Sequence, residues 1–285
     1  MDSPLEETAM RVRLSIIALM FLGLAACGGG GPPAPAGLGY SVPNPAAVTY
    51  MTADTSYIEI DAMGQMMQMS TAQSATVNAV FADVAGAVQV TLTYEDFGAR
   101  LTQPMGAPMT ADESGIKGPL VYSVDRTGNV TVGSVPDVTG NASTLFAPLS
   151  TMQAFLPGLP GTGVGVGDMW TDTVSYSGDE GPGTISATTI SQYSVVGDVI
   201  VDGRSMLRID ITGSSVSETE AAVEGMDVFQ SMSAMMEGHL LWDMQAGVMH
   251  ERVLTFEGDG TTEVSAAPMA MSMQMNGTST TRRIN

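Results

Sequence analysis

The sequence has few of the residues from which most catalytic and nucleic-acid-binding sites are built. Its 285 residues include one cysteine, two histidines and 10 Lys and Arg residues, against 30 Asp and Glu residues. A single cysteine excludes an intramolecular disulfide framework and a CxxC zinc site. Nucleic-acid binding is disfavoured because it relies on basic side chains that neutralise phosphates, and Lys117 is the only lysine.

Catalytic signatures are also absent from the sequence. There is no Gly-x-Ser-x-Gly elbow, and the glycine-rich run at 161–167 lacks the Lys-Ser/Thr of a phosphate-binding loop, which favours a pliable connection. Carboxylates that neighbour each other in the chain lie at expected turns or strand ends, where they are solvated. These are Glu95-Asp96, Asp112-Glu113, Asp179-Glu180 and Glu218 with Glu220. We therefore predict no enzyme, no catalytic residue and no cofactor.

What the sequence does contain is enough apolar material for a folded core. Apolar residues make up 44% of the chain, which also has 33 Gly, 15 Pro and 23 Met, while charged residues are only 14%. That balance is typical of a globular chain rather than a disordered one. The net charge of −20 predicts an electronegative, solvated surface.

The amino terminus carries the pattern of a secretory signal. Arg11 and Arg13 precede an apolar run of 13 residues, 14–26, which ends at Cys27. A basic start, a run too short to span a bilayer comfortably and small residues before a break define such a signal. Because residues 1–9 are acidic, Met10 is an alternative start.

Leu24-Ala25-Ala26-Cys27 resembles the lipobox of bacterial lipoproteins. The resemblance implies cleavage after residue 26 and lipidation of Cys27, so that acyl chains anchor the protein to a membrane. Gly28 follows in place of the Asp that retains enteric lipoproteins at the inner membrane, which favours the outer membrane, with the protein facing the periplasm or the cell surface. We predict a signal peptide at 1–26, a lipidated Cys with a Gly/Pro tether at 27–45, and one β-rich domain at 46–285.

Alternation of apolar and polar residues dominates the predicted domain. Val88, Val90, Leu92 and Tyr94 alternate with polar residues, as in a strand with one buried face, and turn signals such as Asp202-Gly203 separate such runs. We predict a mainly β fold, a curved antiparallel sheet of about a dozen strands. Residues 219–236 fit a helix as well as an irregular strand.

One stretch has helical spacing instead. Leu145, Leu149, Met152 and Leu156 predict a short helical insert near 141–156, with Pro148 inside it. Because proline disrupts a helix interior, the insert is either kinked or two short helices.

The expected order of a meander, a helical segment and further hairpins resembles the half-barrel lipoprotein carriers of the LolA/LolB type. Segments 155–160, 166–170 and 241–247 also look like landmarks of exported proteins of this build. The resemblance implies a curved sheet around a hydrophobic cavity closed by helices. It carries over no functional residue.

Methionine clusters are the most unusual feature of the domain. They are Met63, Met66, Met67 and Met69; Met226, Met232, Met235 and Met236; and Met269, Met271, Met273 and Met275. The last cluster alternates, which places its thioethers on one face of a strand. Such side chains pack cores and line adaptable apolar grooves, but thioethers also suit Cu(I). We predict an apolar ligand groove lined by Met271, Met273, Met275, Met67, Met69 and Trp242.

The two histidines lie on either side of an expected hairpin around 244–247. That hairpin pairs Leu241 with His250 and His239 with Arg252, so both histidines share one face. We predict a solvated outer pair and no metal site, although both could assist a Cu(I) site.

The sequence thus predicts a non-enzymatic, membrane-anchored lipoprotein that binds a hydrophobic or lipid-like ligand, or a lipidated partner, in an apolar groove. Two alternatives remain open: a structural lipoprotein subunit of an envelope complex, and a Met-rich Cu(I)-binding protein.

Overall fold

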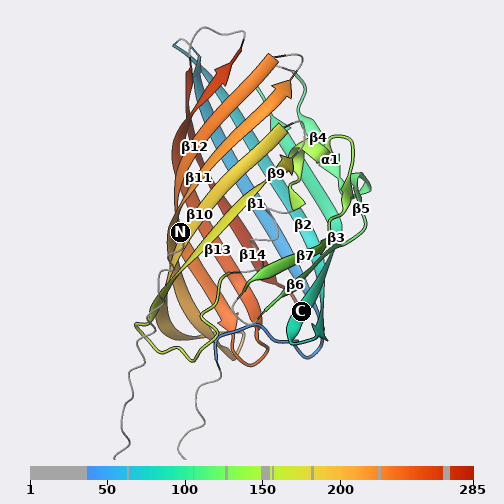
Figure 1. Cartoon of the computed structure of the whole chain (residues 1–285), viewed down its shortest axis with the longest axis vertical. Helices are drawn as coiled ribbons and strands as arrows, with labels where there is room; N and C mark the ends of the chain where they lie inside the picture. The colour runs from blue at the N-terminus through green and yellow to red at the C-terminus, as the bar shows by residue number, and fades with distance from the viewer. Residues whose placement is uncertain are drawn as a thin grey trace, which may run out of the picture. The chain divides into compact units, whose positions relative to one another are not determined.

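The alternating segments form one large antiparallel sheet in the computed structural model of the chain (Figure 1). The structure describes residues 37–285 apart from 63, 105, 126–127, 149–154, 156, 181–182, 224–225 and 266–269. The predicted signal peptide, Cys27 and the first half of the predicted tether, 28–36, therefore lie outside the described residues. No described helix is long and apolar enough to cross a membrane.

Among the described residues, twelve strands make up the large sheet. They are β1 (Ala47–Ala62), β2 (Gln65–Val84), β3 (Ala87–Thr102), β4 (Met109–Asp112), β6 (Leu120–Val124), β7 (Val130–Ser134), β9 (Met169–Glu180), β10 (Gly183–Val201), β11 (Arg204–Val223), β12 (Met226–Asp243), β13 (Val248–Val264) and β14 (Met271–Arg283). Two short strands, β5 (Ile116–Lys117) and β8 (Asp137–Val138), pair separately. The prediction of a mainly β fold with about a dozen antiparallel strands is confirmed.

The sheet joins the two ends of the described chain at its centre. Its order is β7-β6-β3-β2-β1-β14-β13-β12-β11-β10-β9, with β4 beside β3. The first long strand therefore pairs with the last, through contacts such as Tyr50 with Arg283. The sheet curves but does not close, because β7 and β9 form its two ends (Figure 1). The ambiguous residues 219–236 belong to the β11–β12 hairpin, apart from 224–225, which are not described.

Glycines on the concave, inner face of the sheet allow the close approach of neighbouring side chains. Gly277 on β14 lies beside the ring of Phe256, and Gly260 on β13 lies beside the side chain of Met232, so a Cβ at either glycine would meet that neighbour. Missing side chains on one face let a sheet bend towards that face. Gly213, Gly238 and Gly258 face the same way.

The core fills one end of the inner face. Tyr40 packs edge-on against Trp242, Tyr50 against Phe155, and Phe146 against both Tyr94 and Phe97. Tyr40 also donates a hydrogen bond to the carbonyl of Pro157 at 2.7 Å. The connection between β8 and β9 thus covers this end of the sheet.

The helical insert predicted at 141–156 is confirmed as short and interrupted. Helix α1 (Ala142–Leu145) ends where Phe146 turns extended, with φ −132° and ψ 121°. Pro148 and Phe155 are helical again, while residues 149–154 and 156 are not described. Proline is tolerated in the first turn of a helix but not in its interior, which explains the break before it. A 3-10 turn, η1 (Glu113–Gly115), precedes β5.

Candidate ligand-binding cavity

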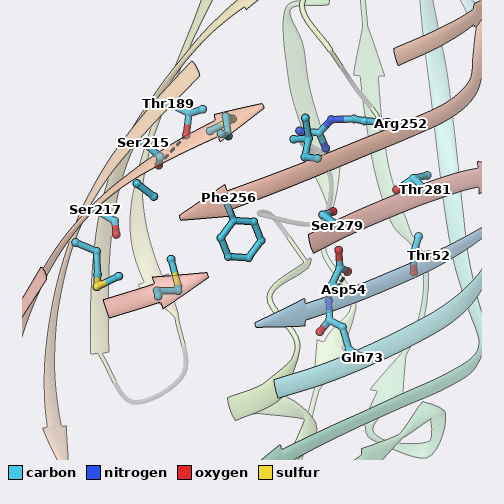
Figure 2. A pocket seen from close by; sticks show the side chains of 15 residues that line it. Thr52, Asp54, Gln73, Thr189, Ser215, Ser217, Arg252, Phe256, Ser279 and Thr281 are labelled. Carbon is cyan, nitrogen blue, oxygen red and sulfur yellow. Dashed lines mark hydrogen bonds between the residues drawn. The ribbon is translucent and has the colours of Figure 1, made fainter. Parts of the chain in front are cut away.

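A cavity of about 350 Å³ lies on the inner face beyond the core (Figure 2). Seven strands contribute to it: β1, β2 and β10 to β14. Its lining consists of Thr52, Asp54, Gln73, Thr189, Ser215, Ser217, Met232, Ala234, Met236, Arg252, Leu254, Phe256, Met275, Ser279 and Thr281. Strand register explains where the space comes from. Gly258 and Ala234 are directly paired small residues beside Met275, so this row leaves room above the sheet.

The apolar part of the lining comes mainly from the last three strands. Met232 and Met236 lie four residues apart on the same face of β12, and Phe256 is the direct partner of Met236 on β13. Met275 and Leu254 complete this part. Flexible thioethers beside an aromatic ring adapt to ligands of irregular shape.

The polar part of the lining comes from β1, β2, β10, β11 and β14, together with Arg252 on β13. Gln73 Nε2 donates to Asp54 Oδ2 at 3.0 Å, and the hydroxyls of Thr189 and Ser215 lie 3.1 Å apart. Figure 2 shows Thr189 with Ser215 on one side of Phe256 and Asp54 with Gln73 on the other. The cavity is therefore amphipathic rather than uniformly apolar.

Arg252 is the one basic residue in this lining. It is half-buried, and its direct partners across the sheet, Leu240 and Thr281, are both buried. Burial lowers the pKa of Arg252, whereas Tyr193 and Asp54 act in the opposite direction. The guanidinium of Arg252 is thus a poorly solvated positive charge in the wall of the cavity.

Of the six residues predicted to line a groove, Met275 lines this cavity and the other five are not part of its lining. Met271 and Met273 lie on the same inner face, and the residues that alternate with them along β14 are exposed. Met273 is buried, and its sulfur accepts a hydrogen bond from Thr262 Oγ1 at 3.0 Å. Met67 and Met69 also lie on this face, because they pair directly with Ile60 and Ile58, the partners of Met273 and Met275.

Trp242 lies elsewhere, in the core at the other end of the inner face. It is 1% exposed, and its ring centroid lies 5.4 Å from that of Tyr40. Met235 points to the opposite face of β12 and is 63% exposed. Met63 and Met269 lie outside the described residues. The three methionine clusters therefore do not contribute equally to the cavity.

The predicted arrangement of the histidines is wrong. Asp243 pairs with Val248 as expected, but a bulge follows, so that Leu241 pairs with Glu251 and His239 with Val253. A bulge adds one residue to one strand and reorients its side chain. His250 is consequently 3% exposed. His239 lies on the partly exposed face instead, where its Nε2 is 3.4 Å from Glu251 Oε1. The two histidines are not a solvated pair.

Sequence reasoning also missed an ionic cluster at the β12–β13 turn, in which Asp243 and Arg283 are buried and Arg204 is exposed. Asp243 Oδ2 lies 2.8 Å from Arg283 Nη2 and 3.3 Å from Arg204 Nη1, while Asp243 Oδ1 accepts from the backbone N–H groups of Gln245 and Ala246. Burial opposes ionisation of Asp243, but these hydrogen bonds and charges outweigh it and lower its pKa. The cluster ties β14 and β11 to the turn. An Asp followed by Gly four residues later was its only local signal.

No protein-family model matches the sequence. A search of curated proteins likewise gives no significant match. Among the described residues, no group of three His, Cys, Asp or Glu side chains is arranged to hold a metal ion. The geometry of the cavity is therefore the main guide to function.

Proposed function

We propose that this protein is an exported, lipid-anchored binding protein that holds a small hydrophobic or lipid-like ligand inside its curved sheet. The cavity carries this proposal. Its volume of about 350 Å³ lies within the range of about 300–1,000 Å³ that is usual for small-molecule sites. Its thioether, aromatic and aliphatic lining, with a few polar groups, is also typical of such sites.

A binding role agrees better with the lining than a catalytic one. Asp54 is the only carboxylate among the residues that line this cavity, and its Oδ2 accepts a hydrogen bond from Gln73. Paired carboxylates, or a nucleophile with an adjacent base, are the usual requirements for hydrolysis. The Cu(I) and structural-subunit alternatives stay predictions, with no described feature that favours either.

Filling the cavity tests the proposal. Ala234→Trp would place an indole against Gly258 inside the cavity, whereas Met235→Trp changes the neighbouring residue on the exposed face. We expect the wild type to bind the neutral fluorescent probe N-phenylnaphthylamine. Ala234→Trp should weaken binding by about tenfold or more, which corresponds to about 1.4 kcal/mol, while Met235→Trp should leave it unchanged.

Circular dichroism and thermal unfolding of both variants separate a filled cavity from a disrupted sheet. The proposal fails if the wild type does not bind the probe, or if the two folded variants bind it equally. Should Ala234→Trp not fold, Met275→Trp fills the same cavity from β14, and Gln274→Trp is its exposed control.

A further inference from the structure

Arg252, the cation in the cavity wall, has no anionic partner among the residues that the structure describes. Within the described part of the chain, Arg204, Arg208, Arg282 and Arg283 each form an ion pair within 4.0 Å, and Arg252 forms none. No hydrogen bond from Arg252 to a described residue is found either. In a chain with 30 acidic residues, a half-buried guanidinium without a bound carboxylate is unusual, because buried charges are normally paired.

Asp54 does not neutralise Arg252 directly. It influences the guanidinium across the cavity, but it is not within ion-pair distance, and its side chain is engaged by Gln73. Figure 2 shows Ser279 between Arg252 and Asp54, with Thr281 beside them. A planar guanidinium with nearby hydroxyl donors matches the geometry of a carboxylate.

The same surroundings limit the charge and shape of an occupant. One guanidinium balances one negative charge, and Asp54 would repel a second. The apolar wall of Met236, Phe256 and Met275 begins beside Leu254, two residues from Arg252 on β13. We infer that the ligand is an amphipathic monocarboxylate, whose acid group pairs with Arg252 and whose apolar chain lies along this wall. This inference rests on the proposed binding function and specifies its ligand class.

A matched pair of ligands and a matched pair of variants test the inference. Decanoate and decanol share a chain and differ in the charged group, and isothermal titration calorimetry measures both. Arg252→Met removes the cavity cation, whereas Arg282→Met removes an exposed arginine that pairs with Glu251. We expect decanoate to bind at least about tenfold more tightly than decanol, as a charge-assisted hydrogen bond allows.

Arg252→Met should remove that preference and leave decanol binding unchanged, while Arg252→Lys should keep part of it and Arg282→Met all of it. Asp54→Asn, which removes the opposing charge, should strengthen decanoate binding. Equal binding of both ligands, or an unchanged preference in Arg252→Met, overturns the inference and leaves the proposed function standing. If neither decanoate nor decanol binds, both the inference and the proposed function are contradicted. If Arg252→Met does not fold, the inference is judged from the preference of the wild type for decanoate over decanol and from the change in that preference in Asp54→Asn.

Discussion

Buried polar residues at the β12–β13 turn differ in how fully they are satisfied. Asp243 receives backbone and guanidinium donors at distances of 2.8–3.3 Å. Neither ring nitrogen of His250 has a hydrogen-bond partner among the described residues, although the side chain is 3% exposed. A buried imidazole without a partner is tolerated only while it is neutral. The bulge that places it there thus has an energetic cost.

His250 should make stability depend on pH. Burial and the charges of Arg283 and Arg204 lower its pKa, against a weaker opposite influence of Glu251. Below the unfolded value of about 6.5, the unfolded chain binds a proton that the folded chain refuses, so the free energy of unfolding falls as pH falls. This loss stops once pH is below the folded pKa.

Thermal unfolding of the wild type, His250→Leu and His239→Leu over this pH window measures the effect. His250→Leu should flatten the dependence, whereas His239→Leu, at the partly exposed position, should retain it. The Asp243 contribution is separable, because its lowered pKa means that its stabilisation is lost only at more acidic pH. An unchanged slope in His250→Leu would contradict the assignment.

At the scale of elements, local sequence period was a good guide to strands and a poor guide to register. Alternation correctly placed Met271, Met273 and Met275 on one face, because the side-chain period of a strand is two. The hairpin at 244–247 was also predicted, yet its bulge shifted every pair beyond Trp242 by one residue.

The glycines on the inner face allow neighbouring side chains to approach the strands closely, and Gly277 is the position that tests this role. Valine there would press against the ring of Phe256 and the carbonyl of Thr55. We expect Gly277→Val to lower the free energy of unfolding by about 1–3 kcal/mol, the usual cost of overpacking. Urea denaturation measures this value. Asn276→Val changes an exposed neighbour on β14 and should have little effect; equal stability of the two variants would show that the close approach is unimportant.

At the scale of the whole molecule, the sheet is assembled around the β1–β14 pair. These strands are more than 200 residues apart in the chain, and contacts such as Tyr50 with Arg283 join them. The cavity contains residues from both sides of this seam. Closing such long loops is entropically costly and slows folding, so the domain depends on its ends being paired.

The proposed anchor belongs to the same scale. Cys27→Ser removes the thiol that acylation requires, and the variant should move from the membrane fraction to the soluble envelope fraction of a bacterial host. Immunoblotting of fractionated cells measures this, and Ala26→Gly, which keeps a small residue before Cys27, should remain in the membrane fraction. Membrane association of Cys27→Ser equal to that of the wild type would contradict lipid anchoring.

The sequence by itself determined the mainly β fold, the shared face of regularly alternating residues and the interrupted helix, because these follow from periods of two or a few residues and from the rigidity of proline. Only the tertiary structure decided which inner residues meet. Arg252, Asp54 and Met275 come from three strands, and their shared cavity depends on pairing between distant parts of the chain. His250 became buried through a bulge that no local pattern marks. Register across strands is set by the packing of a whole face, which is why the cavity could not be read from its separate segments.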